Sequence, residues 1–218
     1  MTEENVPERY ALVLCDVQLD FLNAIPSEAR PALVTQLRDL LQAARRANWL
    51  VVFSGTRFPS AYEGVHPRHR LFGGLKRLNR KQGDGTVHWL MEGHPGAEIH
   101  PELQPVEGEP VVWRSELRPG EGLISALRAK ATTKVVLAGV KTASGVLATC
   151  EALVDQGLLV YIVRECVADN DQARGEAALQ HILPQYADIF AVDTFREQIS
   201  QEIMMDMYIA FKTAPRAG

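Results

Sequence analysis

Several features that would assign a protein to a specialised class are scarce in this sequence. No apolar run is long enough to cross a bilayer. The first ten residues, MTEENVPERY, are acidic and polar, unlike a signal peptide. The formal net charge is only −4 over 218 residues, so we expect no binding to nucleic acid or to a membrane surface. With no repeat or low-complexity tract either, the sequence predicts a soluble, cytoplasmic, globular protein.

Cysteine is also scarce. The three residues Cys15, Cys150 and Cys166 have no paired spacing. An odd number of unpaired cysteines excludes a disulfide framework and is typical of a reducing compartment. We therefore expect three buried, free thiols.

The sequence does contain short apolar runs that alternate with segments of helical spacing. Continuous apolar runs without alternation are typical of parallel strands covered on both faces. The pattern predicts a three-layer α/β fold, with a mostly parallel sheet of about six strands and helices on both faces. The expected strands are 10–17, 50–54, 110–113, 135–138, 158–163 and 189–192. The expected helices are 31–48, 123–131, 144–156 and a segment capped by Asp169 or Asp171.

These elements predict one domain with two extensions. We expect a loose lead-in at 1–9, a domain at 10–200 and a helical tail at 201–218 that provides a possible subunit contact. Helical spacing begins at about residue 194, and an apolar stripe in this tail would pack as core or between subunits. The stripe consists of Met204, Met207, Tyr208 and Phe211.

The least regular region, residues 55–96, is rich in glycine and too long for an idle connector. Long loops in compact domains are usually lids or binding loops. It contains His66, His69, His88 and His94. No carboxylate stands at a metal-ligand spacing and no helix aligns these imidazoles, so we expect solvated histidines, no metal and no other cofactor.

The stretch KVVLAGVKTASGVLAT, residues 134–149, is the strongest candidate for a functional turn. It predicts a buried strand that ends at Gly139, a tight turn and a helix N-terminus, with Thr142 and Ser144 as candidate caps. This arrangement lies at the carboxyl edge of a sheet, where α/β proteins bind ligands, and a helix N-terminus favours negative charge.

Asp16 stands at the end of the first predicted strand. A carboxylate there is costly to bury unless it has partners. It is therefore either a helix or turn cap or a working acid with a shifted pKa.

Three segments in this order resemble signatures of the isochorismatase-like, or cysteine hydrolase, superfamily. They are DVQLDF at 16–21, EGHPGAEIHPEL at 92–103 and GVKTASGVLAT at 139–149. The resemblance covers roughly residues 10–195 and implies the family's α/β fold. It also implies hydrolysis of a small-molecule substrate and assembly into a homodimer or homotetramer.

The resemblance also shows what is missing. Amidases of this superfamily use Asp, Lys and a nucleophilic Cys, but the cysteine position here is Gly145 and the nearest basic residue to the lysine position is Arg114. Isochorismatases of the family also have glycine there and hydrolyse a vinyl ether without a covalent intermediate. By this resemblance Asp16 would be the general acid, Gly145 would leave room for substrate or water, and Arg114 would hold a substrate carboxylate.

The resemblance further implies an anion-binding nest of backbone N–H groups near Lys141 and Gly145, and a cis peptide between Val140 and Lys141. It places a set of residues at the substrate, namely Phe21, Trp113, Val140, Lys141 and Ser144.

Three hypotheses about function remain. The first is a hydrolase that acts without a cysteine nucleophile on a small carboxylated substrate. The second is a catalytically inactive family member that serves as a ligand-binding or oligomeric module. The third is an amidase with a relocated nucleophile, such as Ser144 or one of the cysteines.

Overall fold

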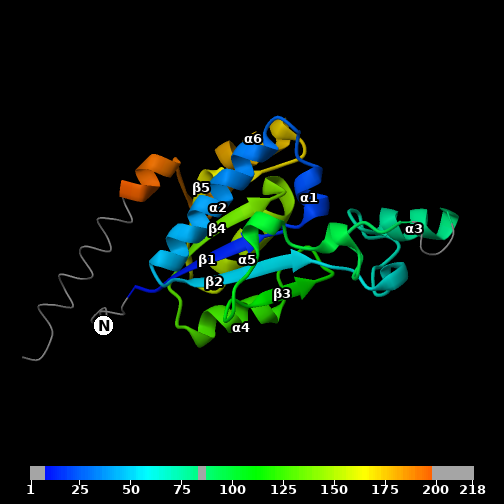
Figure 1. Cartoon of the computed structure of the whole chain (residues 1–218), viewed down its shortest axis with the longest axis horizontal. Helices are drawn as coiled ribbons and strands as arrows, with labels where there is room; N and C mark the ends of the chain where they lie inside the picture. The colour runs from blue at the N-terminus through cyan, green and yellow to red at the C-terminus, as the bar shows by residue number, and fades with distance from the viewer. Residues whose placement is uncertain (1–7, 83–86, 198–218) are drawn as a thin grey trace, which may run out of the picture.

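The computed structural model describes residues 8–82 and 87–197. Its centre is a six-stranded sheet in the order β3-β2-β1-β4-β5-β6, and every neighbouring pair is parallel (Figure 1). The α/β class and the parallel sheet predicted from the apolar runs are thereby confirmed. The strands are β1 (Tyr10–Cys15), β2 (Leu50–Thr56), β3 (Val111–Arg114), β4 (Lys134–Val140), β5 (Leu159–Ala168) and β6 (Asp188–Phe190).

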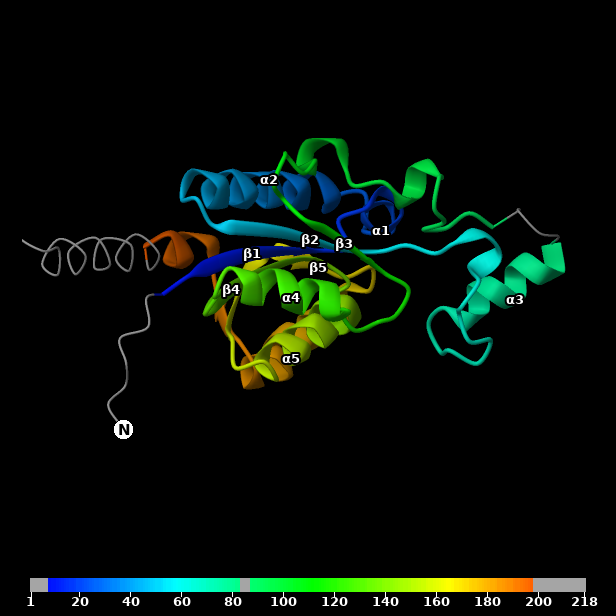
Figure 2. The same cartoon turned by 90° about the horizontal axis from the view of Figure 1, so that it is seen from below.

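Helices cover both faces of the sheet. Helix α2 lies on one face, and α4 and α5 lie on the other (Figure 2). Helix α6 contributes Ala178 and Leu179 to the same core cluster as α4 and α5, so it belongs to their face. Asp171, one of the two predicted caps of α6, accepts a hydrogen bond from the Arg174 N–H. The helices are α1 (Leu19–Asn23), α2 (Arg30–Arg46), α3 (Gly73–Gln82), α4 (Glu121–Ala129), α5 (Leu147–Val154) and α6 (Gln172–His181).

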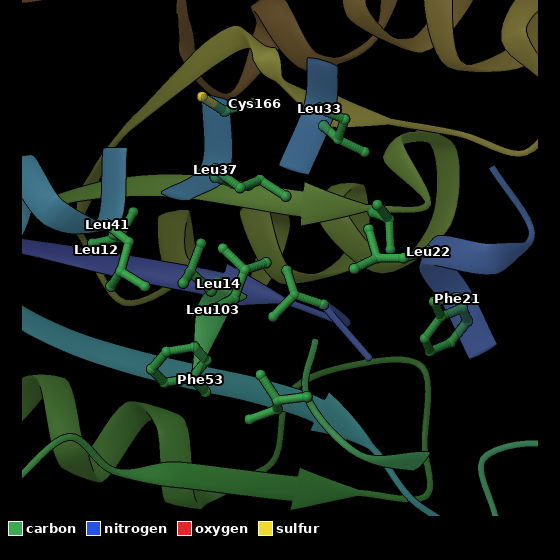
Figure 3. Packing of buried hydrophobic residues seen from close by; sticks show 14 of the residues in the cluster. Leu12, Leu14, Phe21, Leu22, Leu33, Leu37, Leu41, Phe53, Leu103 and Cys166 are labelled. Atoms are coloured by element: carbon green, nitrogen blue, oxygen red, sulfur yellow. The ribbon is translucent and has the colours of Figure 1, made fainter. Parts of the chain in front are cut away.

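Strand β1 shows why the sheet is central. All six of its residues are buried, since alternate side chains enter the two separate cores. Leu12 and Leu14 face α2, whose Leu37 points toward them (Figure 3). Cys15 faces α5 instead, where its thiol contacts the Thr149 hydroxyl at 3.3 Å. The strand therefore ends in a fixed position, and so does Asp16 that follows it.

The segment between β2 and β3 leaves the sheet and carries α3 beyond the carboxyl ends of the strands (Figures 1 and 2). Neither α3 nor α1 was expected. We call this segment, residues 57–110, the excursion. Residues 60–62, 95–97 and 101–103 form single 3₁₀ turns in it. The prediction of an irregular loop over residues 55–96 was therefore wrong for α3.

Two further details differ from the sequence-based expectation. Gly139 does not end β4, which continues to Val140 through a bulge at which Gly139 has φ 123°. A side chain there would collide with the carbonyl of Cys15, so the close approach of β1 and β4 requires glycine. The predicted tail at 201–218 and its apolar stripe lie outside the described residues, although residues 192–197 are helical.

No helix within residues 8–82 and 87–197 is long and apolar enough to span a membrane.

Candidate active site

Asp16 occupies the carboxyl end of the central strand β1 in a left-handed conformation, with φ 54°. Its N–H donates to the carbonyl of Ser54 on the neighbouring strand, and the residue is only 2% exposed. Backbone strain of this kind in a residue other than glycine clusters at functional sites. The conformation turns the carboxylate toward the ends of β2 and β3.

Four hydrogen bonds hold the Asp16 carboxylate. Its Oδ1 accepts from the N–H of Thr56 at 2.9 Å, the Thr56 hydroxyl at 2.9 Å and Arg114 Nη1 at 3.0 Å. Its Oδ2 accepts from Arg114 Nη2 at 2.7 Å. Because β1, β2 and β3 are adjacent and parallel, their carboxyl ends bring Asp16, Thr56 and Arg114 together.

The two-pronged contact of Arg114 is made with Asp16. Its side chain is 2% exposed and its Nε donates to the carbonyl of Leu117 at 3.5 Å. Desolvation is the largest influence and opposes the charge on Arg114, but Asp16, Cys15 and Glu116 together outweigh it and raise the pKa of Arg114 above its usual value. Arg114 thus lies in the site, as the sequence suggested. Its two terminal nitrogens are bonded to Asp16, so they are not free to bind a substrate carboxylate as we had expected.

The turn after β4 differs from the prediction. There is no cis peptide among the described residues, so the expected cis bond between Val140 and Lys141 is wrong. The chain turns instead at Lys141, which is left-handed with φ 64° and ψ 65°. A single π-helical turn, Thr142–Val146, then leads into α5.

The expected caps are also not formed by this turn, and three of its backbone N–H groups already have partners. Neither Thr142 nor Ser144 caps it, and the Thr142 hydroxyl is buried without a partner among the described residues. Asp169 instead accepts from the N–H of Ala143 at 3.0 Å, while the N–H groups of Ser144 and Val146 donate to the Lys141 carbonyl. These three N–H groups are therefore unavailable to an anion.

Gly145 lies directly beside Asp16. A Cβ at this position would stand 2.7 Å from Asp16 Oδ2 and 3.7 Å from Arg114 Nη2. Since real Cβ atoms essentially never approach so closely, any side chain here would displace the carboxylate. The absence of a side chain keeps the space beside Oδ2 open. That this space receives substrate or water stays a prediction.

A pocket of about 420 Å³ opens above these residues. Six predicted site residues line it, but Trp113 and Val140 do not. Trp113 neighbours Arg114 on a strand and so points the other way, where it stacks under Arg57 at 3.6 Å. Val140 is fully buried as the last residue of β4. The predicted residues in the lining are Asp16, Phe21, Arg114, Lys141, Ser144 and Gly145.

The rest of the lining was missed from the sequence. Thr56 is the last residue of β2, Leu117 follows β3, and an apolar wall comes from the excursion between these strands. The only signal for that wall was the unusual length of the predicted loop. The wall consists of Leu71, Phe72, Leu75, Leu78, Val87 and Trp89.

The four histidines of the excursion do not form a metal site. Nδ1 of His66 and of His69 accepts from backbone N–H groups, and the rings of His88 and His94 stack at 3.9 Å. Across the described ranges no group of three or more His, Cys, Asp or Glu side chains is arranged to hold a metal ion.

All three cysteines are free and buried. Burial raises the pKa of Cys15 to about 11 and those of Cys150 and Cys166 to about 12, above the ordinary value of 9.0. None of them lines the pocket. They therefore lack both the position and the thiolate character of a nucleophile.

The burial and the raised pKa values of the three thiols predict how they react with a labelling reagent. At pH 8 a thiol with a pKa of 11 is roughly a hundredfold less ionised than one with a pKa of 9, so Ellman's reagent should leave the native protein unlabelled and react with three thiols after denaturation. Because the shift is upward, native reactivity should appear only as the pH approaches 11. Fast labelling of one native thiol at pH 8 would contradict this description.

Comparison with known proteins finds a matching family model and a related sequence. The model of the Isochorismatase domain family matches residues 10–194. Maleamate amidohydrolase from Pseudomonas putida is 27% identical over 192 residues, which cover 84% of this chain and 85% of that protein.

Solved structures show the same fold. An isochorismatase family protein from Desulfovibrio vulgaris is similar with a TM-score of 0.74 at 20% identity, covering 88% of this chain and 99% of that one. Nicotinamidase from Bacillus subtilis has a TM-score of 0.66 at 21% identity, with 84% and 100% covered. N-carbamoylsarcosine amidase from Thermoplasma acidophilum has a TM-score of 0.64 at 20% identity, with 84% and 96% covered.

Proposed function

Since this chain belongs to the isochorismatase family of hydrolases, we propose that it hydrolyses a small carboxylated molecule without a covalent enzyme intermediate, with Asp16 as the general acid. The observation that carries the proposal is the open space beside Asp16 Oδ2, at the base of a pocket that is otherwise mostly apolar. A pocket of about 420 Å³ lies in the range used for small ligands.

The two oxygens of Asp16 are not equivalent. Oδ1 accepts three hydrogen bonds and is fully engaged, whereas Oδ2 accepts one, from Arg114. Oδ2 is also the atom that faces Gly145. Proton exchange with a substrate or a water molecule therefore belongs to Oδ2, while Oδ1 keeps the carboxyl group in place.

An enolpyruvyl ether suits this arrangement. Asp16 Oδ2 would deliver a proton to the terminal methylene carbon of the vinyl group, converting the C=C bond into a methyl group and an oxocarbenium ion. Water would then add to that cation and return a proton to Asp16. The resulting hemiketal would break its C–O bond to give an alcohol or phenol and pyruvate, so the overall consumption is one water molecule.

A relocated nucleophile is less well supported. Ser144 lines the pocket, but no histidine among the described residues does so, and an unactivated hydroxyl is a weak nucleophile. The cysteines lie elsewhere. A covalent adduct on Ser144, detected by intact-mass measurement with a reactive amide, would favour this third mechanism over the one proposed.

A binding module without turnover is the second candidate. The observation that favours it is the buried, four-bonded carboxylate of Asp16, which matches a stable ion pair as well as a working acid. Such a module would be stabilised by its ligand through mass action and would release no product.

The experiment that separates the two candidates measures pyruvate. The protein would be incubated with 2-phenoxyprop-2-enoate and with isochorismate, and pyruvate would be detected by coupling to lactate dehydrogenase. Equal amounts of phenol and pyruvate from the first substrate would support the hydrolase. Thermal stabilisation by 2-phenoxyprop-2-enoate with no pyruvate would support the binding module instead.

Gly145→Ala tests the space beside Asp16. Because the new methyl would stand 2.7 Å from Oδ2, we expect the carboxylate to shift and turnover to fall by at least about tenfold. The matched control is Gly120→Ala, since a Cβ at Gly120 meets nothing within 4 Å. Equal kcat/KM values for the two variants would show that no reacting atom uses this space.

A further inference from the structure

We propose that the side-chain ammonium of Lys141 binds the substrate carboxylate, and that the pocket is selective for a monocarboxylate with a ring-sized apolar body. This deepens the proposed function, because it names the group that recognises the substrate. The binding part nevertheless stands without turnover.

Lys141 is a cation of the pocket that has no partner among the described residues. It is half-buried and lines the pocket, yet no acceptor or carboxylate contacts its ammonium among the described residues. The other cation of the pocket, Arg114, has both terminal nitrogens paired with Asp16. A carboxylate that enters the pocket therefore finds its free charged donor at Lys141.

The backbone at Lys141 supports this assignment. Its φ of 64° lies in the left-handed region, which glycine or asparagine would occupy at lower cost. A strained conformation at the edge of a pocket suggests a role for the residue that holds it. Here the conformation places a long cationic side chain in the lining, next to Ser144 and Gly145.

The charges of the lining indicate how many carboxylates fit. Both terminal nitrogens of Arg114 are already bonded to Asp16, so Lys141 is the one lining cation that is open to a substrate group. One substrate carboxylate would pair with it. A second would lack a counter-charge in a partly desolvated site, and such a charge is costly.

The remaining surface defines the rest of the ligand. Eight of the fourteen lining residues are apolar or aromatic, including Phe21, Leu75 and Trp89. The aromatic rings of Phe21 and Trp89 meet edge to face, with centroids 4.9 Å apart. They form a firm apolar wall that suits a flat ring better than a polar chain.

Isothermal titration with three unreactive probes tests this inference. Phenoxyacetate has one negative charge, phenoxyacetamide has none and phenoxymalonate has two. We expect the wild type to bind phenoxyacetate at least about tenfold more tightly than phenoxyacetamide, as a charge-assisted hydrogen bond allows. Phenoxymalonate should bind no more tightly than phenoxyacetate.

Three variants assign that preference to Lys141. Lys141→Met should bind phenoxyacetate and phenoxyacetamide equally, and Lys141→Arg should keep most of the preference. Because methionine is unbranched and retains a Cβ, it adopts the left-handed backbone at the same cost as lysine. Lys130→Met is the matched control, since Lys130 is exposed on the far end of α4, and it should behave as the wild type.

The possible results are distinct. An undiminished preference in Lys141→Met, tighter binding of phenoxymalonate, or no binding of any probe by the wild type would overturn the inference. Lys141-dependent binding without any pyruvate release would sustain it and defeat the proposed hydrolysis. Pyruvate release with the same KM in wild type and Lys141→Met would support the proposed hydrolysis and overturn the role of Lys141 in binding.

Discussion

Asp16→Asn should reduce kcat for pyruvate release by about a hundredfold or more, because general acid catalysis typically contributes 10² to 10⁴ in rate. The asparagine oxygen can replace Oδ1 and accept from Thr56, so the backbone contacts at that side are retained. Its amide group would replace Oδ2, which faces Gly145 and accepts from Arg114 Nη2, and it can neither accept that hydrogen bond nor donate a proton to carbon. Initial rates with 2-phenoxyprop-2-enoate at saturation measure the loss.

The control for this variant carries the same chemical change elsewhere. Asp155 is exposed at the end of α5, so Asp155→Asn should retain wild-type kcat. Thermal unfolding of both variants verifies that they are folded. A folded Asp16→Asn protein with wild-type turnover would remove Asp16 from the mechanism.

Arg114→Met should lower the free energy of unfolding by about 3–5 kcal/mol, because it leaves the buried Asp16 carboxylate without its counter-charge. Both side chains are almost completely buried, at 2% and 3% exposure. Methionine fills a similar volume, so the loss arises from the unpaired charge rather than from a cavity. Urea denaturation provides the measurement.

Two further variants identify the cause. Arg118 pairs with Glu151 at the surface, where its side chain is 59% exposed, so Arg118→Met should cost less than about 1 kcal/mol. The double variant Asp16→Asn/Arg114→Met should recover part of the stability lost in Arg114→Met, since it no longer buries a charge. Equal losses for Arg114→Met and Arg118→Met would contradict the description of a buried ion pair.

The fold was predictable wherever burial imposed a simple pattern on the sequence. Strands such as β1 and β4 are buried on both faces and therefore appear as continuous apolar runs. Helix α3 was not predictable, because its sequence GGLKRLNRKQ starts with two glycines and contains only two apolar side chains. Its position is set by packing of the excursion against the pocket, which local sequence does not encode.

The site was predictable only in part for a related reason. Asp16 and Gly145 fall within recognisable segments, and the ends of parallel strands meet at one edge of the sheet. The partner of Arg114 and the conformation of Lys141 depend on strand register and on a single φ angle. Neither quantity can be read from residue types, and so Arg114 was expected to bind a substrate carboxylate and the peptide before Lys141 was expected to be cis.

The central claim is that Asp16 protonates a substrate carbon, and its most direct test is the rate of pyruvate formation from 2-phenoxyprop-2-enoate in H₂O and in D₂O. Formation of a C–H bond in the committed step predicts a slower wild-type reaction in D₂O, with Asp16→Asn at background in both solvents. Equal wild-type rates in the two solvents, full activity in the variant, or no pyruvate from the wild type would contradict the claim.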